Sequence, residues 1–289
     1  MRSLLSRVGR VEIRMAKKGK TQIWLEYSAA RLVLGFLGIL PRKAAVKFAI
    51  GITRLGFYFL GGLRKVALLN LEIAFPESSD LERRSFAKGC FENLGRVLGE
   101  VSQFHKATPE SLAKLIDFEL DAESASLEKK VRAERRGILI TTGHLGNWEL
   151  LVFAYAALRE PISYLARPID NPLIEEMTLR YRTRFGNRPI NKTNSAMLAI
   201  SILRDGGTLG VLSDVNAHPK EGVFVPFFGV QACTPSGAAM IAIRAAAIIY
   251  PAFCVWDKEA GHYRFVGGAV IEPANTGDRK KDIIETTAA

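Results

Sequence analysis

The stretch GILITTGHLGNWELLVFAYAAL, residues 137–158, decides the fold class. Its first six residues form a short β-rich run, and residues 149–158 have the composition of a buried helix. Further β-rich runs and helical stretches alternate after it, the runs at 161–166, 208–213 and 248–256 and the helices at 172–184, 195–204 and 236–247. Such alternation is typical of parallel strands joined by helical crossovers. We therefore expect an α/β fold with a mixed, mostly parallel sheet flanked by helices.

A histidine and a glutamate stand between the first strand and its helix, where ligands bind in sheets of this kind. His144 lies between Gly143 and Gly146, and Glu149 follows five residues later. Positions five apart are roughly 140° apart on a helix, so the two side chains meet only if His144 is in the loop. There Glu149 could fix the imidazole tautomer and make His144 a general base, while the amides of residues 146–148 could stabilise an oxyanion. An incidental histidine beside a helix N-terminus is the alternative.

Two more polar clusters follow later strands. Residues 166–188 carry five arginines and three acidic residues, a pattern that suits phosphate binding but also a solvated helix face. Asp214 ends the third β-rich run and could hold one of these arginines. Because Pro226 and Gly229 break the apolar run VFVPFFG, we expect a loop there, either as the wall of an acyl-chain pocket or as ordinary core.

The positive net charge of the chain favours an anionic partner. The chain of 289 residues has 40 Lys+Arg against 29 Asp+Glu, a net charge of +11 at pH 7, which suits nucleic acid, an acidic lipid surface or an acidic carrier protein. Residues 1–20 hold seven of the basic residues and one acidic residue. No basic-aromatic platform or known nucleic-acid-binding motif is recognisable, so we expect no nucleic acid as a partner.

An apolar segment follows the basic one. Glu26 and Arg31 interrupt it, and its uninterrupted apolar run, residues 32–40, is short of the roughly 20 residues that a membrane span needs. We expect a helix that lies in the membrane interface, with a single span and a soluble core helix as alternatives. The predicted organisation is a basic N-terminal arm at 1–20, a membrane-associating helical segment at 21–63 and an α/β domain at 64–289.

Helices are expected as far as residue 130, with a break at 76–79 after which Asp80 caps the next helix. Cys90, Cys233 and Cys254 stand far apart and lack the spacing of metal ligands, so we expect free thiols and no metal.

Three blocks in order resemble one known family. They are GHLGNWEL (143–150), RPIDNPLIEE (167–176) followed by Arg182 and Arg184, and DVNAHPKEGVFVPFFGVQACTPSG (214–237). Together they resemble the late acyltransferases of lipid A biosynthesis, the lauroyl and myristoyl transferases of Kdo-lipid A, whose H-x4-D/E pattern relates them to glycerolipid acyltransferases. The likeness runs from about residue 21 to the C-terminal DRKKDIIETTAA, where we expect the chain to stop short of that family's final helix.

The resemblance implies roles for particular residues. His144 would deprotonate an acceptor hydroxyl for attack on an acyl thioester, and Glu149 would orient His144. Arg167, Arg182 and Asp214 match further active-site positions and would bind substrate. No cofactor, metal or nucleotide is implied.

The resemblance also implies partners and a location. The donor would be acyl-acyl carrier protein and the acceptor an anionic glycolipid, at the cytoplasmic face of the inner membrane in lipopolysaccharide biosynthesis. A related acyltransferase for another membrane lipid or glycolipid and a catalytically inactive membrane-bound relative are the alternatives. A serine hydrolase is disfavoured, because the sequence has no G-x-S-x-G elbow.

Overall fold

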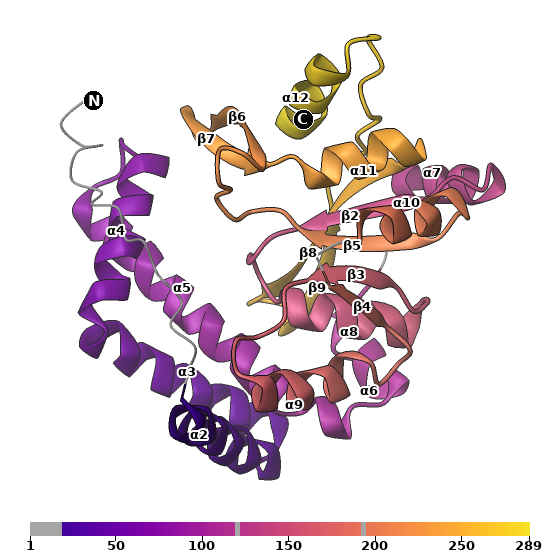
Figure 1. Ribbon diagram of the computed structural model, residues 1–289. Coiled ribbons are helices and arrows are strands. Elements are labelled where there is room, and N and C mark those ends of the chain that lie inside the picture. The colour runs from indigo at the N-terminus through magenta and orange to yellow at the C-terminus, as the bar shows by residue number, and fades with distance from the viewer. Residues whose placement is uncertain (1–18, 119–121, 192–194) are drawn as a thin grey trace.

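The computed structural model describes residues 19–118, 122–191 and 195–289 (Figure 1). Most of the basic arm predicted at residues 1–20 therefore lies outside the described residues. The chain forms a group of N-terminal helices beside an α/β part that holds the sheet (Figure 1). The N-terminal helices are α2 (Lys20–Ile39), α3 (Arg42–Phe59), α4 (Gly61–Ala74) and α5 (Asp80–Val101). The predicted division at residue 63 stays a prediction.

Helices α3 and α5 lie in close contact because two glycines of α5 face the backbone of α3. A Cβ atom on Gly95 would come within 2.6 Å of the Ile50 Cα, and one on Gly99 within 2.6 Å of the Val46 Cα. Helix α5 begins with a capping box in which Ser79 and Glu82 satisfy each other's backbone N–H groups. The predicted cap at Asp80 is therefore one residue off, since Asp80 is the first helical residue.

The sheet has seven strands in the order β1-β9-β8-β2-β5-β3-β4. All neighbouring pairs are parallel except β8–β9, which is antiparallel. The expectation of a mixed, mostly parallel sheet is thus confirmed. The strands are β1 (Ile116–Asp117), β2 (Ile138–Thr142), β3 (Ser163–Ala166), β4 (Arg188–Asn191), β5 (Thr208–Leu212), β8 (Ile248–Asp257) and β9 (His262–Gly267).

Alternate residues of β2 point into two separate cores, as the two-residue period of a strand requires. Ile138 and Ile140 join the core under α8 (Trp148–Leu158), whereas Leu139 joins the core under α10 (Ala196–Arg204) and α11 (Gly237–Ala245). The remaining helices are α6 (Pro109–Ala113), α7 (Ala122–Ala133), α9 (Pro172–Arg182), α12 (Arg279–Ala288) and the short 3-10 helix η1 (Phe104–Lys106). Helices of the α/β part therefore cover both faces of the sheet.

The run VFVPFFG belongs to a hairpin, so the expectation of a loop is wrong. Strands β6 (Gly222–Phe227) and β7 (Val230–Pro235) pair in a separate two-stranded sheet that projects beside the N-terminal helices (Figure 1). Phe228 and Gly229 form its turn with φ angles of 48° and 73°, as a tight hairpin turn demands. Pro226 is tolerated because a two-stranded sheet consists of edge strands. The Phe228 ring contacts Phe75 at the end of α4, with 5.5 Å between centroids.

In the part of the chain that the structure describes, no single helix is both long enough and apolar enough to cross a membrane. Helices α3 and α4 meet the length and composition requirement only as a pair, and they are bent by 87° at their junction.

Candidate active site

The site lies at the carboxyl edge of the sheet, where β2 and β5 are neighbours. Thr142 and Leu212 are paired at the ends of these parallel strands. Two residues further along each chain, His144 and Asp214 therefore face one another. The His144 backbone N–H donates to Asp214 Oδ2 at 2.6 Å, and His144 Nδ1 lies 2.9 Å from Asp214 Oδ1. Gly143 makes this approach possible, since a Cβ there would lie 3.0 Å from the carboxylate.

The contact with Asp214 determines which nitrogen of His144 can accept a proton. A carboxylate only accepts hydrogen bonds, so in the neutral imidazole the hydrogen is on Nδ1 and the lone pair is on Nε2. The His144 side chain is 47% exposed, and the Trp148 ring meets it edge-on at 4.8 Å between centroids. The imidazole is thus oriented by protein groups and open to a substrate.

Glu149 pairs with an arginine. Its carboxylate accepts a hydrogen bond from Arg182 Nε at 3.0 Å and a second, shorter one from Arg182 Nη2. Both side chains are largely buried, with 18% and 22% exposed. Burial by itself lowers the pKa of Arg182, but the hydrogen bonds and charge of Glu149 outweigh it, and the pKa lies above its usual value.

The observed pairs of side chains differ from those that the sequence predicted. Glu149 was expected to orient His144 and Asp214 to hold an arginine, yet among the described residues Asp214 orients His144 and Glu149 holds Arg182. The reason is the packing of α8 beside α9. Glu149 lies in the first turn of α8, and its carboxylate faces Arg182, the last residue of α9.

The other arginines of the 166–188 cluster have different surroundings. Arg167 donates to Asp170 at 2.8 Å and is 63% exposed, at the same edge of the sheet because it follows β3. Arg184, two residues after α9, donates to the backbone oxygen of Phe104 in the 3-10 helix. Arg180 pairs with Glu176 at the surface, and Arg188 begins β4 at the opposite, amino edge of the sheet. Arg182 and Arg167 therefore remain the candidates for the site among the arginines of this cluster.

The loop between His144 and Glu149 is fixed to β8 rather than open. The Asn147 N–H donates to Cys254 O at 2.7 Å, so of the three amides expected to stabilise an oxyanion, that of Asn147 is already occupied. The role of the Gly146 and Trp148 amides stays a prediction. Gly146 has φ 66°, and a Cβ there would come within 2.1 Å of Cys254 O. Asn93 of α5 also donates to Gly146 O at 2.7 Å. Sequence reasoning missed Asn93, because no local pattern links residues 53 positions apart.

Within the described ranges, no three His, Cys, Asp or Glu side chains are grouped as ligands of a metal ion.

A model of the bacterial lipid A biosynthesis acyltransferase family matches residues 14–289. The chain belongs to that family. This acyltransferase is 29% identical over 222 residues to the lipid A biosynthesis lauroyltransferase of Escherichia coli strain K12, over 76% of this chain and 70% of the relative. It is 25% identical over 246 residues to the lipid A biosynthesis palmitoleoyltransferase of the same organism, over 84% and 74%. The lipid A biosynthesis myristoyltransferase of that strain is 22% identical over 194 residues, 67% of this acyltransferase and 59% of the relative.

Proposed function

We propose that the protein transfers a fatty acyl chain from acyl-acyl carrier protein to a hydroxyl group of a lipid A precursor. The observation that carries the proposal is the contact of His144 with Asp214 at the carboxyl edge of the sheet, in a chain of the lipid A acyltransferase family. Relatives named for lauroyl, palmitoleoyl and myristoyl transfer support acyl transfer as the reaction and a lipid A precursor as the acceptor.

In the proposed mechanism, His144 is the general base. Its Nε2 takes the proton of the acceptor hydroxyl as the oxygen attacks the thioester carbonyl, and the charge that develops on the ring is stabilised by Asp214. A tetrahedral intermediate forms, and the C–S bond then breaks. The carrier thiolate leaves and takes the proton from His144, so that the histidine is restored. Each turnover therefore forms one ester bond and releases one thiol.

In the proposed mechanism, two arginines bind the anionic acceptor. Arg167 is exposed beside the site and suits a phosphate of the glycolipid, because a guanidinium group can bind phosphate oxygens in a bidentate manner. Arg182 is mostly enclosed by its pair with Glu149. We propose that Arg182 positions the rim of the site and contacts the inner part of the acceptor's headgroup.

The proposed setting is the cytoplasmic face of the inner membrane. Large apolar side chains are exposed on α2, α3 and α4, among them Leu32, Ile39, Phe59 and Leu63. Such a surface suits the interface of a bilayer, and the net charge of +11 suits both anionic lipids and an acidic carrier protein.

The test is a transfer assay with purified protein, acyl-acyl carrier protein and tetra-acylated Kdo-lipid A, read by lipid mass spectrometry. We expect a product one acyl group heavier, which His144→Ala abolishes. His105→Ala is the matched control, because that histidine is exposed and contacts Ser102 O, away from the site. Activity of His144→Ala within tenfold of the unmodified protein would remove the general-base assignment. Product with a lysophospholipid acceptor alone would move the proposal to another membrane lipid.

A further inference from the structure

One side of helix α5 carries a row of apolar side chains that the described part of the chain leaves exposed. Phe86, Cys90 and Leu94 follow one another at intervals of four residues, which places them on one side of the helix. All three are exposed. Apolar residues at this spacing usually face a core, so an exposed row indicates a surface that binds something apolar. We call these three residues the α5 row.

The α5 row runs close to the candidate active site. Asn93, the residue before Leu94, donates a hydrogen bond to Gly146 O at 2.7 Å. Gly146 is two residues from His144, and Leu145 between them is exposed. One end of the row therefore lies beside the loop that carries the proposed general base.

The other end of the α5 row meets the β6–β7 hairpin through a series of aromatic rings, which we call the aromatic bridge. Phe86 contacts Phe75 with 5.8 Å between ring centroids, and Phe75 contacts Phe228 in the hairpin turn with 5.5 Å. Phe227 contacts Phe228 in turn at 4.7 Å, and both of these rings are exposed. Figure 1 shows the hairpin projecting towards α4. The bridge therefore joins the hairpin to the N-terminal helices and leaves apolar surface open.

The aromatic bridge also adjoins the helices that are proposed to contact the membrane. Phe75 directly follows α4, on which Leu63, Val66 and Ile73 are exposed. An apolar surface thus extends from α4 across the bridge and along the α5 row to the loop at His144. We call the aromatic bridge, the α5 row and Leu145 together the apolar track.

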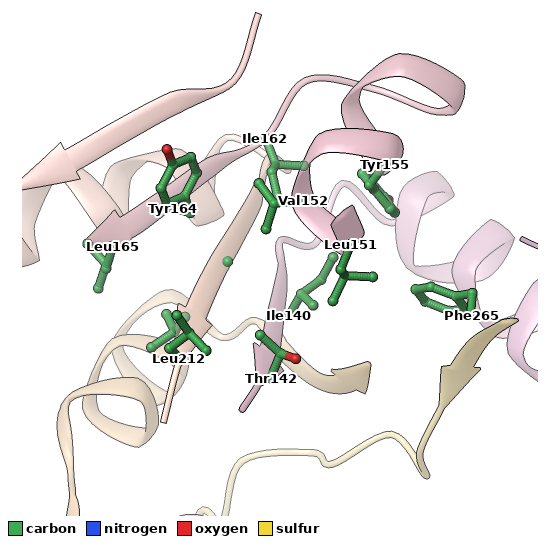
Figure 2. A pocket seen from close by; sticks show the side chains of 12 residues that line it. Ile140, Thr142, Leu151, Val152, Tyr155, Ile162, Tyr164, Leu165, Leu212 and Phe265 are labelled. Carbon is green, nitrogen blue, oxygen red and sulfur yellow. The ribbon is translucent and has the colours of Figure 1, made fainter. Parts of the chain in front are cut away.

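The enclosed cavity beside the site does not offer the same room. Its free volume is about 40 Å³, roughly three times what a single buried water requires. Figure 2 shows side chains such as Ile140, Leu151 and Ile162 forming its walls. A lipid A precursor carries several acyl chains, so it needs a surface that is several side chains wide and open to the bilayer.

We propose that the apolar track binds the acyl chains of the acceptor lipid while the acceptor hydroxyl lies at His144. The inference rests on the proposed function, from which it takes a lipid A precursor as the acceptor. The donor's chain arrives on a carrier protein, whereas the acceptor's chains arrive in a bilayer, and the track begins at the helices proposed to lie on that bilayer. Chains that leave the bilayer would otherwise meet water, and each apolar side chain that covers them adds to the affinity.

Cys90 allows a direct test, because it lies in the middle of the α5 row and the other two cysteines, Cys233 and Cys254, are buried. The unmodified protein is alkylated with a maleimide in detergent micelles, and peptide mass spectrometry locates the label. Mildly alkaline pH is used, since partial burial raises the pKa of the Cys90 thiol. We expect saturating tetra-acylated Kdo-lipid A to slow the alkylation of Cys90 at least about fivefold, by occupancy alone. The same headgroup without acyl chains should leave the rate unchanged.

Two variants test the track by kinetics. We expect Leu94→Gln and Phe228→Asn each to raise the KM of the acceptor at least about tenfold, the scale of one large apolar contact, and to leave the KM of the carrier-protein donor unchanged. Asparagine suits position 228 because the φ angle there is 48°. Leu198→Gln is the matched control, since Leu198 is 54% exposed and Leu94 49%, but Leu198 lies on α10, outside the track.

The outcomes separate the inference from the proposed function. Protection of Cys90 by the acceptor without any transfer supports the track and contradicts the proposed reaction. Alkylation of Cys90 at the same rate with and without the acceptor overturns the inference even if transfer is observed. Equal protection by vesicles of anionic phospholipid alone would make the track part of the membrane-binding surface and would also overturn it. So would variants that raise the KM of the donor instead of the acceptor.

Discussion

At the scale of single residues, the site depends on two carboxylates with different partners. Asp214 accepts hydrogen bonds from both the backbone and the ring of His144, whereas Glu149 is held by Arg182. A carboxylate that fixes the tautomer of a base contributes to the rate, whereas the loss of a carboxylate from an enclosed ion pair leaves the other charge without a partner and destabilises the fold. The two acidic residues are therefore expected to respond differently to neutral substitution.

The first prediction is that Asp214→Asn lowers kcat by a factor on the order of 10² to 10⁴, because the amide can stabilise the wrong tautomer of His144 and cannot balance its charge. The measurement is steady-state transfer. Asp205→Asn is the control, since that aspartate follows α10 and contacts Ser201. A loss smaller than tenfold would return the orienting role to Glu149.

The second prediction is that Glu149→Gln destabilises the fold by about 1–3 kcal/mol, because Arg182 loses a charged partner in a largely buried setting. Denaturant unfolding in detergent measures the change in the free energy of unfolding. Glu176→Gln is the comparison, since Glu176 pairs with Arg180 at the exposed surface of α9 and its loss should cost less than about 1 kcal/mol. Equal costs for the two variants would contradict the structural role of the enclosed pair.

At the scale of secondary-structure elements, the contact between α3 and α5 determines how the N-terminal helices are joined to the candidate active site. The close approach at Gly95 and Gly99 fixes α5, and Asn93 on the same helix holds the loop that follows His144. A shift of α5 would thus move the loop at Gly146 and the start of α8. The two glycines have a packing role that the helix propensity of glycine alone would not suggest.

The third prediction compares two glycines of α5 that have different surroundings. Gly99→Ala should destabilise the protein by about 1–3 kcal/mol, because the added methyl group meets the backbone of Val46. Gly89→Ala, on the same helix with nothing within 4 Å of the added atom, should stabilise it by about 0.5–1 kcal/mol. Denaturant unfolding of both variants checks the signs, and a stabilising effect of Gly99→Ala would show that the two helices do not meet as described.

At the scale of the whole molecule, the exposed apolar side chains are unevenly distributed. Many lie on α2, α3 and α4, which stand to one side of the sheet (Figure 1). Phe59 and Leu63 are 82% and 60% exposed near the bend between α3 and α4. An apolar surface of this kind is costly in water and is stabilised by a lipid interface.

The fourth prediction is that Phe59→Glu or Leu63→Glu lowers the affinity for vesicles of anionic phospholipid at least about tenfold, since burying one large apolar side chain contributes about 1.5–3 kcal/mol. Co-sedimentation measures the bound fraction. Ile284→Glu is the control, because Ile284 is 44% exposed on α12, away from these helices (Figure 1). High salt should leave most of the unmodified protein on the vesicles, and complete release by salt would show that charge alone holds it there.

The sequence by itself determined the alternation of four central strands with their helices. The β-rich runs at 137–142, 161–166, 208–213 and 248–256 correspond to β2, β3, β5 and β8, and the helices between them end within about two residues of their predicted limits. This was possible because hydrophobic periodicity and turn residues act over a few neighbours along the chain. Strands β1, β4 and β9 and the β6–β7 hairpin were not predicted, and β1 is only two residues long.

Only the tertiary structure decided which side chains meet. Strand β5 inserts between β2 and β3, and this order brings His144 to Asp214 across 70 residues of chain. The direction of the first turn of α8 turns Glu149 towards Arg182 instead. The sequence marked all of these residues as candidates because of their types and their places after strands. Their pairing depends on strand order, register and helix packing, which are contacts between distant segments and leave no periodic signal in the chain.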